Sequence, residues 1–585
     1  MRTERIGQRV RQVTLLNLGR HFSVAPKDWS SFCPRIEEIL TGQSGLLSLD
    51  PALEKLAQHC AAQLLLRHGQ GVMTRPAQAS TSARRSFIEV DADSVEMLEP
   101  RSVGVEHVGL SVMQEIGFSE ELQRLGFNRA QCAATIGNIV GRMAVPGSEL
   151  ATWRWLKHES ALGELLEFDF ARMSLMRLYR ASDQLLRYQS AIEAFIFARV
   201  RGLFSLESTV TLYDLTNTYF EGALTGNRKA ARGHSKEKRS DCVLLTLGLV
   251  LDQSGFVRRS QVFAGNAVEA RTLEVMLNSL RAPPGALVVM DRGIATEANL
   301  VWLTAHGYRY LVVARNQARQ FDPARCVEIT AAGGERIRLQ QVLSPDAQEV
   351  RLYCHSPGRE QKETAIVARL SQRFEHGLAK LCQGLTQRRG EKRLSKLTER
   401  IGRLKEKCHG IGQHYRVEYQ TDASGKKVTA LTWTKEMRGG SQMSHPGVYC
   451  LRSNELTWTA EQMWRTYVML TDLEAVFRSL KSELGLRPIF HHKEARGDGH
   501  LFISVLAYQF VQIIRTRLAQ RGMHDSWASL RQILRVQRRT TSRFATRGGH
   551  ILSVRKASRP ETELAQLYDT LGLDHNPGGL EKLIT

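Results

Sequence analysis

Three polar side chains recur at seven-residue intervals in an otherwise largely apolar stretch of the chain. Tyr467, Glu474 and Lys481 lie in YVMLTDLEAVFRSLK, where leucines, valines and a phenylalanine fill most other positions. Seven residues are nearly two turns of an α-helix, so the spacing predicts that the three side chains share one helix face. A carboxylate held between a phenol and an ammonium group indicates a site that handles charge.

Two more carboxylates, Asp214 and Asp291, each follow a stretch typical of a buried strand. Asp214 closes TVTLYD and Asp291 closes ALVVMD, so we expect both at strand ends, where open α/β sheets place their sites. One aspartate at such a position is often only a turn residue, but two of them favour a shared site. With Glu474 they form a set of three carboxylates, which would repel one another unless cations neutralise them.

The chemistry that three carboxylates support is that of hard divalent metals. Oxygen ligands favour Mg²⁺ or Mn²⁺, and two such ions can activate an attacking oxygen and stabilise a leaving one in phosphodiester displacement. We therefore expect Asp214, Asp291 and Glu474 to bind two ions. Other acidic residues and histidines lack the required spacing or position, and we expect turn, surface or core roles for them: Glu221, Asp241, Asp472, Glu483, His234, His491, His492 and His500.

The elements that must position these carboxylates follow one another in a regular order. Runs of β-branched and apolar residues predict strands at 208–216, 242–251, 257–265, 285–291 and 308–315, with helices at 268–281 and 296–307. Three strands in a meander, followed by strands entered through crossover helices, predict a mixed five-stranded sheet. The fold class is therefore α/β.

The rest of the 585-residue chain is too long for one core and predicts further domains. A β-hairpin over 9–25 around Gly19, a helix over 50–68 and a linker occupy 1–90, and the opening residues resemble the second half of a longer hairpin. The other predicted divisions are a helical DNA-binding or dimerisation domain (91–205), the first part of the α/β core (206–315), a β-rich insertion with a helical arm (316–457), the second part of the core (458–520) and a basic C-terminal region (521–585). A plain solvated helix bundle is the alternative for 91–205.

The composition favours a polyanionic partner. Lys and Arg number 81 against 59 Asp and Glu, which gives a formal charge of +22. The apolar run at 242–251 is shorter than the roughly 20 residues of a membrane-spanning helix, so we expect DNA and no membrane. Nine scattered cysteines without a C-x-x-C pair indicate neither a disulfide framework nor a zinc knuckle. A reduced, bacterial-type cytoplasm with association to the nucleoid fits these features.

Taken together, these stretches resemble the DDE transposases of bacterial insertion sequences. The helix matches the Y-x2-R-x3-E-x6-K signature of that family at Tyr467, Glu474 and Lys481, with Leu470 in place of the arginine. Four further stretches resemble the branch with a large β-rich insertion before the glutamate: LYDLTNTYFEG (212–222), MDRGIATEANL (290–300), GVYCLRSN (447–454) and FRSLKSELGLRPIFH (477–491). The resemblance runs from about 145 to 515 and implies a ribonuclease-H-like core.

The resemblance also implies roles for single residues. Asp214, Asp291 and Glu474 would be the catalytic metal ligands, and Tyr467 and Lys481 would hold DNA phosphates. We expect Arg478 to take over from the arginine missing at Leu470. Family members stack a tryptophan of the insertion on a flipped base and pass through a DNA hairpin, and the candidates are Trp433 and Trp458.

The activity implied is cut-and-paste transposition by a homodimer on double-stranded DNA, at the terminal inverted repeats and in the target. Two alternatives stay open. One is a structure-selective nuclease that cuts without joining. The other is a catalytically inactive derivative that only binds DNA, because the loss of an arginine at Leu470 could weaken phosphate binding.

Overall fold

The computed structural model contains two compact units, residues 1–90 and 91–585, and each is described by itself. The described residues are 2–6, 9–13, 24–41, 50, 53–58, 60–61, 87–206, 210–221, 224, 226–233, 239, 241–280, 285–314, 318–331 and 333–585.

The first unit contains a hairpin and a small helical core. β1 (Arg2–Ile6) and β2 (Arg9–Val13) pair in antiparallel fashion, so the partner of the strand starting at Arg9 precedes it, whereas we had expected the partner to follow Gly19. Gly19 itself lies outside the described residues. α1 (Trp29–Thr41) packs on a helical stretch within 53–61, and Phe32, Ala57 and Cys60 are buried between them.

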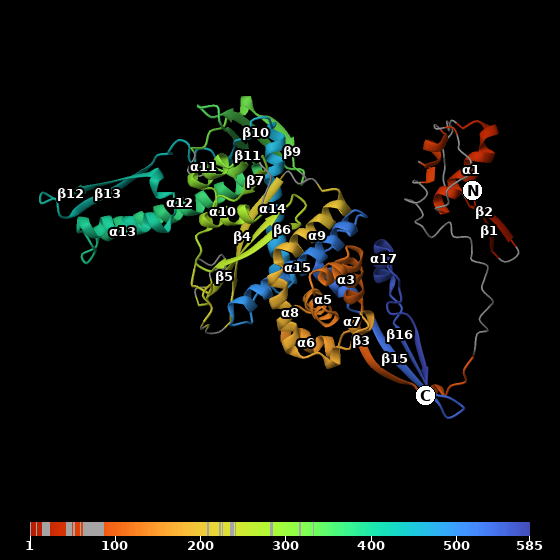
Figure 1. Cartoon of the computed structure of the whole chain (residues 1–585). Helices are drawn as coiled ribbons and strands as arrows, with labels where there is room; N and C mark the ends of the chain where they lie inside the picture. Colours follow the sequence, from red (N-terminus) through yellow and green to blue (C-terminus); the bar gives the residue numbers. More distant parts are fainter. Residues whose placement is uncertain are drawn as a thin grey trace. The chain divides into compact units, whose positions relative to one another are not determined.

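A nine-stranded mixed sheet is the central feature of the second unit (Figure 1). Its strand order is β6-β5-β4-β7-β8-β14-β11-β10-β9. The bounds are β4 (Val210–Tyr219), β5 (Leu244–Leu251), β6 (Val257–Ala264), β7 (Leu287–Met290), β8 (Arg309–Val313), β9 (Val327–Thr330), β10 (Arg336–Leu343), β11 (Val350–His355) and β14 (Val448–Ser453). The five strands predicted from the sequence form one half of this sheet.

The prediction of a five-stranded sheet is therefore wrong, for a simple reason. β14, from the predicted insertion, pairs antiparallel with β8, so it satisfies the backbone groups that would otherwise leave β8 an open edge. β11, β10 and β9 then extend the sheet in turn. Four strands of the predicted insertion belong to the same sheet as the core.

Helices cover the two faces of the core strands. α10 (Thr272–Leu280) and α11 (Glu297–Ala305) pack on one face, where Tyr213, Val288 and Met290 are buried. α14 (Ala460–Arg478) lies against β4, β7 and β8, and its apolar residues share a core with Leu212 and Val289 from the opposite face. A capping box between Thr459 and Gln462 begins α14.

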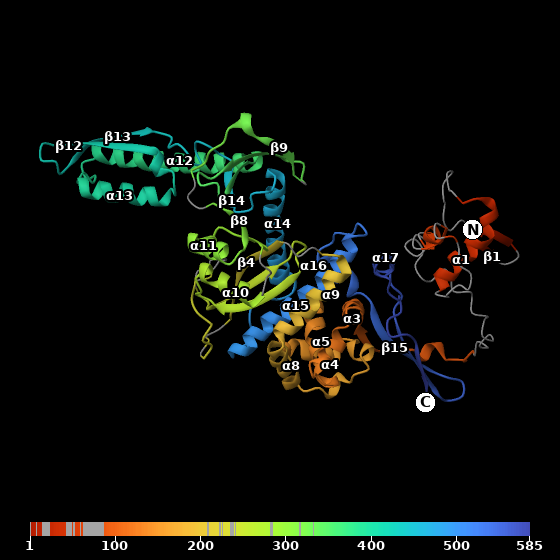
Figure 2. The same ribbon diagram turned by 45° about the horizontal axis from the view of Figure 1, so that its top comes forward.

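The remaining part of the predicted insertion forms an elongated arm, which Figure 2 shows beside the sheet. It consists of α12 (Pro357–Thr386), α13 (Leu394–Lys407) and the hairpin of β12 (Tyr415–Thr421) and β13 (Val428–Lys435). Leu378, Leu397 and Ile401 are buried in a small core of its own. The two helices thus pack against each other, and α12 also packs against the hairpin.

A helical layer adjoins the sheet, and its central helix is α15 (Glu494–Ala519). The surrounding helices are α3 (Gly104–Glu115), α4 (Phe118–Arg124), α5 (Arg129–Ala144), α6 (Glu149–His158), α7 (Leu162–Leu165), α8 (Leu175–Arg187) and α9 (Gln189–Phe204). α15 packs on α3, α5 and α8 and also on β6. It is the one helix of the described part of the chain that is long and apolar enough to cross a membrane, but 78% of its most apolar window is buried inside the protein. Its apolar surface is thus accounted for by core packing.

The C-terminal residues form a compact region that includes a strand from the start of the second unit. α16 (Trp527–Leu534) precedes a four-stranded sheet of order β17-β16-β15-β3, and α17 (Thr562–Leu571) lies between its last two strands in sequence. The strands are β3 (Glu96–Ser102), β15 (Arg538–Ala545), β16 (Ile551–Ala557) and β17 (Glu581–Ile584). Residues 96–102, predicted as part of a helical domain, therefore complete the sheet of the C-terminal region.

Candidate active site

Asp214 and Asp291 stand at the same level of two neighbouring parallel strands. Tyr213 on β4 pairs with Met290, the last residue of β7, and each aspartate is the next residue in its chain. The expectation that Asp214 ends its strand is wrong, because β4 continues to Tyr219 along β5. β7 ends at Met290, so Asp214 lies beside the C-terminal end of this shorter strand.

Both aspartates point toward the sheet face on which α14 lies. Side chains alternate along a strand, and Tyr213 and Met290 are buried on the α10–α11 side, whereas Leu212 and Val289 are buried on the α14 side. Asp214 is half-buried and Asp291 is exposed. Each carboxylate accepts a hydrogen bond from the next backbone N–H, at 2.7 Å from Leu215 and at 2.6 Å from Arg292.

Glu474 and Tyr467 lie two turns apart on α14 and thus on one face of it. Glu474 is exposed and Tyr467 is half-buried. Burial raises the pKa of Tyr467 to about 12, and the nearby negative charges of Asp291 and Glu474 contribute to this rise. The phenol of Tyr467 therefore lies within electrostatic range of both carboxylates, which connects the helix face to the strand end.

Lys481 departs from the predicted geometry. α14 ends at Arg478, and Ser479–Glu483 form a π-helical turn in which the N–H of Leu484 donates to the carbonyl of Ser479. A π turn holds more residues than an α turn, so the seven-residue rule does not carry from Glu474 to Lys481. Lys481 is half-buried in this turn, and Arg478 is exposed at its start.

Leu470, at the position of the expected arginine, has a packing role. It is half-buried and lies against the main hydrophobic core. A charged guanidinium at this point would have to leave apolar neighbours, so the departure from the signature is consistent with the local packing.

An arginine of the arm lies close to this site and is absent from the sequence-based hypothesis. The guanidinium of Arg359, in the first turn of α12, lies 4.9 Å from the ring centre of Tyr449, and that ring lies 6.1 Å from the ring of Tyr467. Arg359 also donates to Glu363 at 2.9 Å. Its positive charge counteracts the upward shift of the Tyr467 pKa. Arg359 lies more than a hundred residues before Tyr467, and no spacing pattern in the sequence connects them.

A family model described as a transposase DDE domain matches residues 206–510, more than half of the chain. The chain belongs to the DDE transposase family. A search of curated proteins found no significant match. The matched range begins just before β4 and ends inside α15, so it includes Asp214, Asp291 and Glu474.

The family supports a metal-dependent nuclease and strand-transferase domain that acts on DNA. In this transposase the strands β6-β5-β4-β7-β8 and their helices give the ribonuclease-H-like order, with the first strand in the centre. The ligands available at Asp214, Asp291 and Glu474 are all carboxylates, a donor set that suits hard divalent cations.

The two tryptophans considered for base stacking both take part in packing. Trp433 lies on β13, opposite Val417, and packs against the core of the arm. Trp458 directly precedes the N-cap of α14, packs against the main core, and its carbonyl accepts a hydrogen bond from Gln341 at 3.3 Å. Both are half-buried, so a role in base stacking stays a prediction for either.

Away from the three carboxylates, Glu149, His491 and His500 form a second, fully buried cluster. Their ligand atoms lie within 4.8 Å of one another. His491 is hydrogen-bonded to Glu149, and the guanidinium of Arg142 lies 3.1 Å from Nδ1 of His500. Sequence spacing had suggested only surface or core roles for these histidines, and two of them meet a carboxylate from α6.

The hydrogen bonds of this cluster argue against a metal site. Arg142 can only donate, so Nδ1 of His500 must accept and its proton resides on Nε2. Neither ring nitrogen then has a lone pair left for a cation. Arg142 also donates to the carbonyl of Gly485 at 3.1 Å, so the cluster joins α5 and α6 to the segment that follows the π turn.

Proposed function

We propose that this transposase cuts DNA at the ends of a bacterial insertion sequence and joins those ends to target DNA by a cut-and-paste reaction. The observation that carries the proposal is the placement of Asp214 and Asp291 at one level of two parallel strands, facing the helix that bears Glu474. Family membership adds DNA as the substrate class.

Asp214, Asp291 and Glu474 would hold divalent metal, with Mg²⁺ or Mn²⁺ as the ion and two ions as the expected number. Such ions, when bound, supply charge neutralisation and activation of oxygen for phosphodiester displacement. The carboxylates would bind the ions. The backbone N–H groups of Leu215 and Arg292 orient the two aspartates by hydrogen bonds.

The cations and the phenol around the carboxylates would position the DNA backbone. Tyr467 keeps its proton at neutral pH, since its pKa is raised to about 12, and its O–H can donate to a phosphate oxygen. Lys481 and Arg478 offer positive charge from the end of α14, and Arg359 offers it from the arm. Contacts of this kind fix the register of DNA without reading its sequence.

Arg359 bears on the alternative of an inactive DNA-binding derivative. That alternative rests on the missing arginine at Leu470. Arg359 of α12 brings a guanidinium close to the paired rings of Tyr449 and Tyr467. The sequence also keeps all three carboxylates, Asp214, Asp291 and Glu474. We therefore favour an active enzyme, and we propose that it works as a homodimer on paired terminal repeats, in the bacterial cytoplasm in association with the nucleoid.

One reaction tests the proposal. The protein is incubated with labelled DNA that carries the ends of the element, with Mg²⁺ and with circular target DNA, and nicks, hairpins and joined products are resolved by electrophoresis. We expect both cleaved ends and joined products. Cleavage without joining would favour the structure-selective nuclease, and binding without cleavage would favour the inactive derivative.

A further inference from the structure

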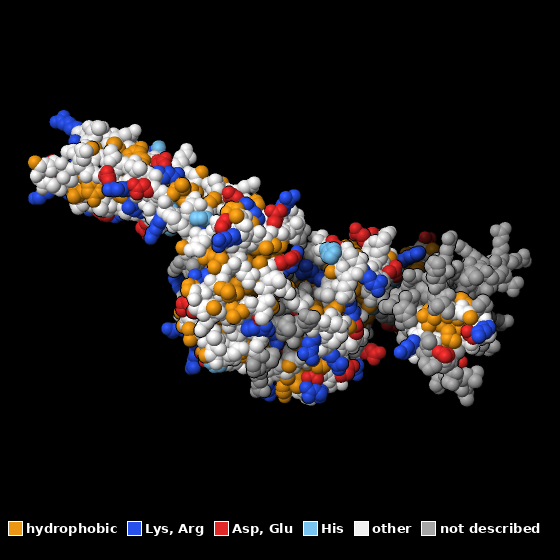
Figure 3. Space-filling view, turned by 90° about the horizontal axis from the view of Figure 1, so that it is seen from above, with side chains coloured by type: hydrophobic (Ala, Val, Ile, Leu, Met, Phe, Trp, Pro, Cys, Tyr) orange, Lys and Arg blue, Asp and Glu red, His pale blue; other side chains and the backbone are white. Residues whose placement is uncertain are grey.

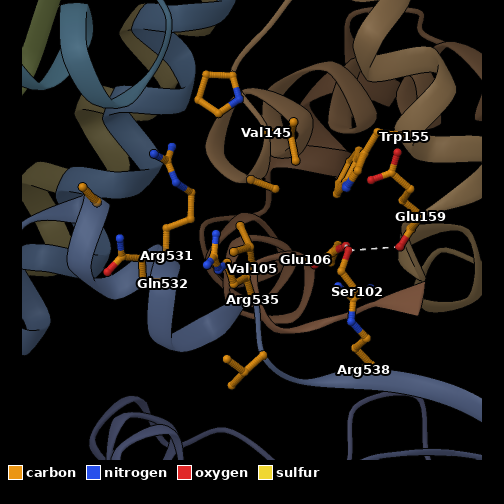
Figure 4. A pocket seen from close by; sticks show the side chains of 14 residues that line it. Ser102, Val105, Glu106, Val145, Trp155, Glu159, Arg531, Gln532, Arg535 and Arg538 are labelled. Carbon is orange, nitrogen blue, oxygen red and sulfur yellow. Dashed lines mark hydrogen bonds between the residues drawn. The ribbon is translucent and has the colours of Figure 1, made fainter. Parts of the chain in front are cut away.

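A groove of about 730 Å³ lies between the helical layer and the C-terminal region. Figure 4 shows Arg531 and Gln532 of α16 on one side, and Trp155 of α6 with Glu159, which follows that helix, on the other. The remaining lining comes from β3, α3, the end of α5 with the loop after it, α16 with the two residues after it, and the start of β15: Ser102, Val105, Glu106, Ala144, Val145, Pro146, Ala528, Arg535, Val536 and Arg538.

Two of the groove arginines have no ion-pair partner among the described residues. Arg535 and Arg538 are exposed, and neither forms an ion pair with a carboxylate of the described residues. The other arginines of β15 and β16 are paired: Arg539 with Glu164 and Glu581, Arg543 with Glu96, and Arg555 with Glu164.

The arginines reach the groove from two sides. Arg531 lies on α16 and Arg535 is the residue that caps its C-terminal end with helical backbone angles, so the two lie on one side of the helix and about 6 Å apart along its axis. Arg538 begins β15, is in register with Ser102 of β3, and lies on that side of the groove (Figure 4). Arg531 already donates to the carbonyl of Glu483 at 2.7 Å, which holds it in place, while Arg535 and Arg538 are available to a ligand.

Two acidic residues line the groove. Glu106 is buried and accepts hydrogen bonds from Ser102 and Ser160 at 2.5 and 2.7 Å; burial raises its pKa, whereas the positive charge of Arg538 acts in the opposite direction. Glu159 is exposed on the wall opposite α16. An anion in the groove would therefore lie on the α16 side, near Gln532 and Arg535.

The walls beside the arginines are apolar. Val145 and Val536 are exposed, with 45% and 59% of their surface accessible, and Pro146 adjoins Val145. Guanidinium groups beside exposed apolar side chains suit a ligand that alternates phosphates with sugars. Over the face seen in Figure 3, by contrast, Lys and Arg side chains are scattered, so total charge alone selects no surface.

We propose that this groove binds the phosphate backbone of double-stranded DNA, as a contact separate from the carboxylate site. The proposal rests on DNA being the substrate of the transposase, but not on cleavage. An acidic peptide is the competing occupant, and the apolar walls beside the exposed arginines favour DNA.

The test is the salt dependence of DNA binding by an Arg535→Ala/Arg538→Ala double variant, measured by fluorescence anisotropy with labelled duplex. Each phosphate contact contributes about −0.9 to the slope of log Kobs against log salt concentration, so we expect the slope to become shallower by about 2. The control is Arg172→Ala/Arg325→Ala, which removes equal charge from exposed arginines paired with Asp169 and Asp322. An unchanged slope in the groove variant, or an equal change in the control, would overturn the proposal.

A second measurement guards against a folding defect. Gln532→Cys places a thiol in the groove, and its alkylation by a maleimide is followed by mass spectrometry of the peptide that contains it. We expect duplex DNA to slow the alkylation and polyglutamate to leave it unchanged. Protection by polyglutamate alone would assign the groove to an acidic peptide. Both measurements are repeated in an Asp214→Asn background, so that loss of cleavage and loss of groove binding are separated.

Discussion

Asp214 and Asp291 are neighbours because β7 ends where β4 continues. Tyr213 and Met290 are paired across the parallel strands, and the chain leaves the sheet directly after Met290. The pairing of β4 with β7 stops at Tyr213 and Met290, and the residue after each of these is one of the two carboxylates. Both carboxylates therefore lie at the end of β7.

We expect Asp214→Asn, Asp291→Asn and Glu474→Gln each to reduce DNA cleavage at least about a thousandfold. An amide cannot supply the charge that a divalent ion requires, and ion-based stabilisation of the reaction is worth several kcal/mol. End binding should change little, because affinity comes mainly from Lys and Arg. Glu461→Gln, on an exposed position of the same helix, is the matched control. A variant of the three that cuts at the parent rate would remove that residue from the site.

Removal of divalent metal should separate binding from cutting. With EDTA we expect the parent protein to bind DNA ends in a gel-shift assay but to leave them uncut, and Mg²⁺ or Mn²⁺ should restore cleavage. Mn²⁺ should also raise the thermal unfolding midpoint of the parent and not that of Asp214→Asn, because only the former keeps the full set of ligands. Equal shifts in both proteins would place the ion elsewhere.

Alanine substitutions of the basic residues around Tyr467 should lower DNA cleavage to different degrees. We expect Arg359→Ala and Lys481→Ala each to lower cleavage about tenfold at physiological salt and to make end binding less salt-dependent. Arg478→Ala should have an effect of similar size if that residue replaces the missing arginine, and a smaller one if Arg359 does. Arg369→Ala, on an exposed position of the same helix as Arg359, is the control. Parent-like activity of Arg359→Ala would exclude it from phosphate positioning.

The cluster around His500 should make the folded protein sensitive to acid. Burial lowers the pKa of His500 to about 3 from an ordinary 6.5, with Arg142, Glu149 and His491 as its charged or titratable neighbours. Between these values the unfolded chain binds a proton that the folded chain does not. Stability should therefore fall as pH decreases from about 6.5 toward 3, by up to about 1.4 kcal/mol per pH unit.

Glu149 should steepen the decline further into the acid range. Burial acts to raise its pKa, but the hydrogen bond with His491 and the nearby positive charges bring it down to about 2, so its contribution is lost as pH falls below about 4.5. Urea unfolding of the parent and of His500→Gln between pH 4 and 7.5 tests the contribution of His500 to this pH dependence, with exposed His492→Gln as the control. A pH profile that His500→Gln leaves unchanged would contradict the assignment.

The α/β core was predictable from sequence because its signals are local. Alternation, apolar runs and helix caps place β4 to β8, α10 and α11 within about two residues of their observed bounds, except that β4 ends three residues later and α10 begins four residues later than predicted. The end of β4 was misjudged because the strand continues through LTNTY, whose polar residues are typical of a turn but are mostly buried here: Thr216, Asn217 and Thr218.

Features that depend on distant segments could not be predicted in this way. The pairing of β14 with β8 and the approach of Arg359 to Tyr449 both join residues far apart in sequence. The π turn at Ser479–Glu483 is a matter of local hydrogen-bond geometry, and hydrophobic spacing cannot distinguish it from an α-helix. The three carboxylates proposed as metal ligands could thus be selected from the sequence, and the cations around them only in part.

The pairing of β3 with β15 can form only late in the synthesis of the chain. Ser102 leaves the ribosome long before its partner Arg538, and at roughly 5–20 residues per second the roughly 435 intervening residues take on the order of 20–90 s. During that interval β3 has an unpaired edge, of the kind that invites association with other chains. A nascent chain that stops before Arg538 would carry all three carboxylates and still lack Arg538 of the groove.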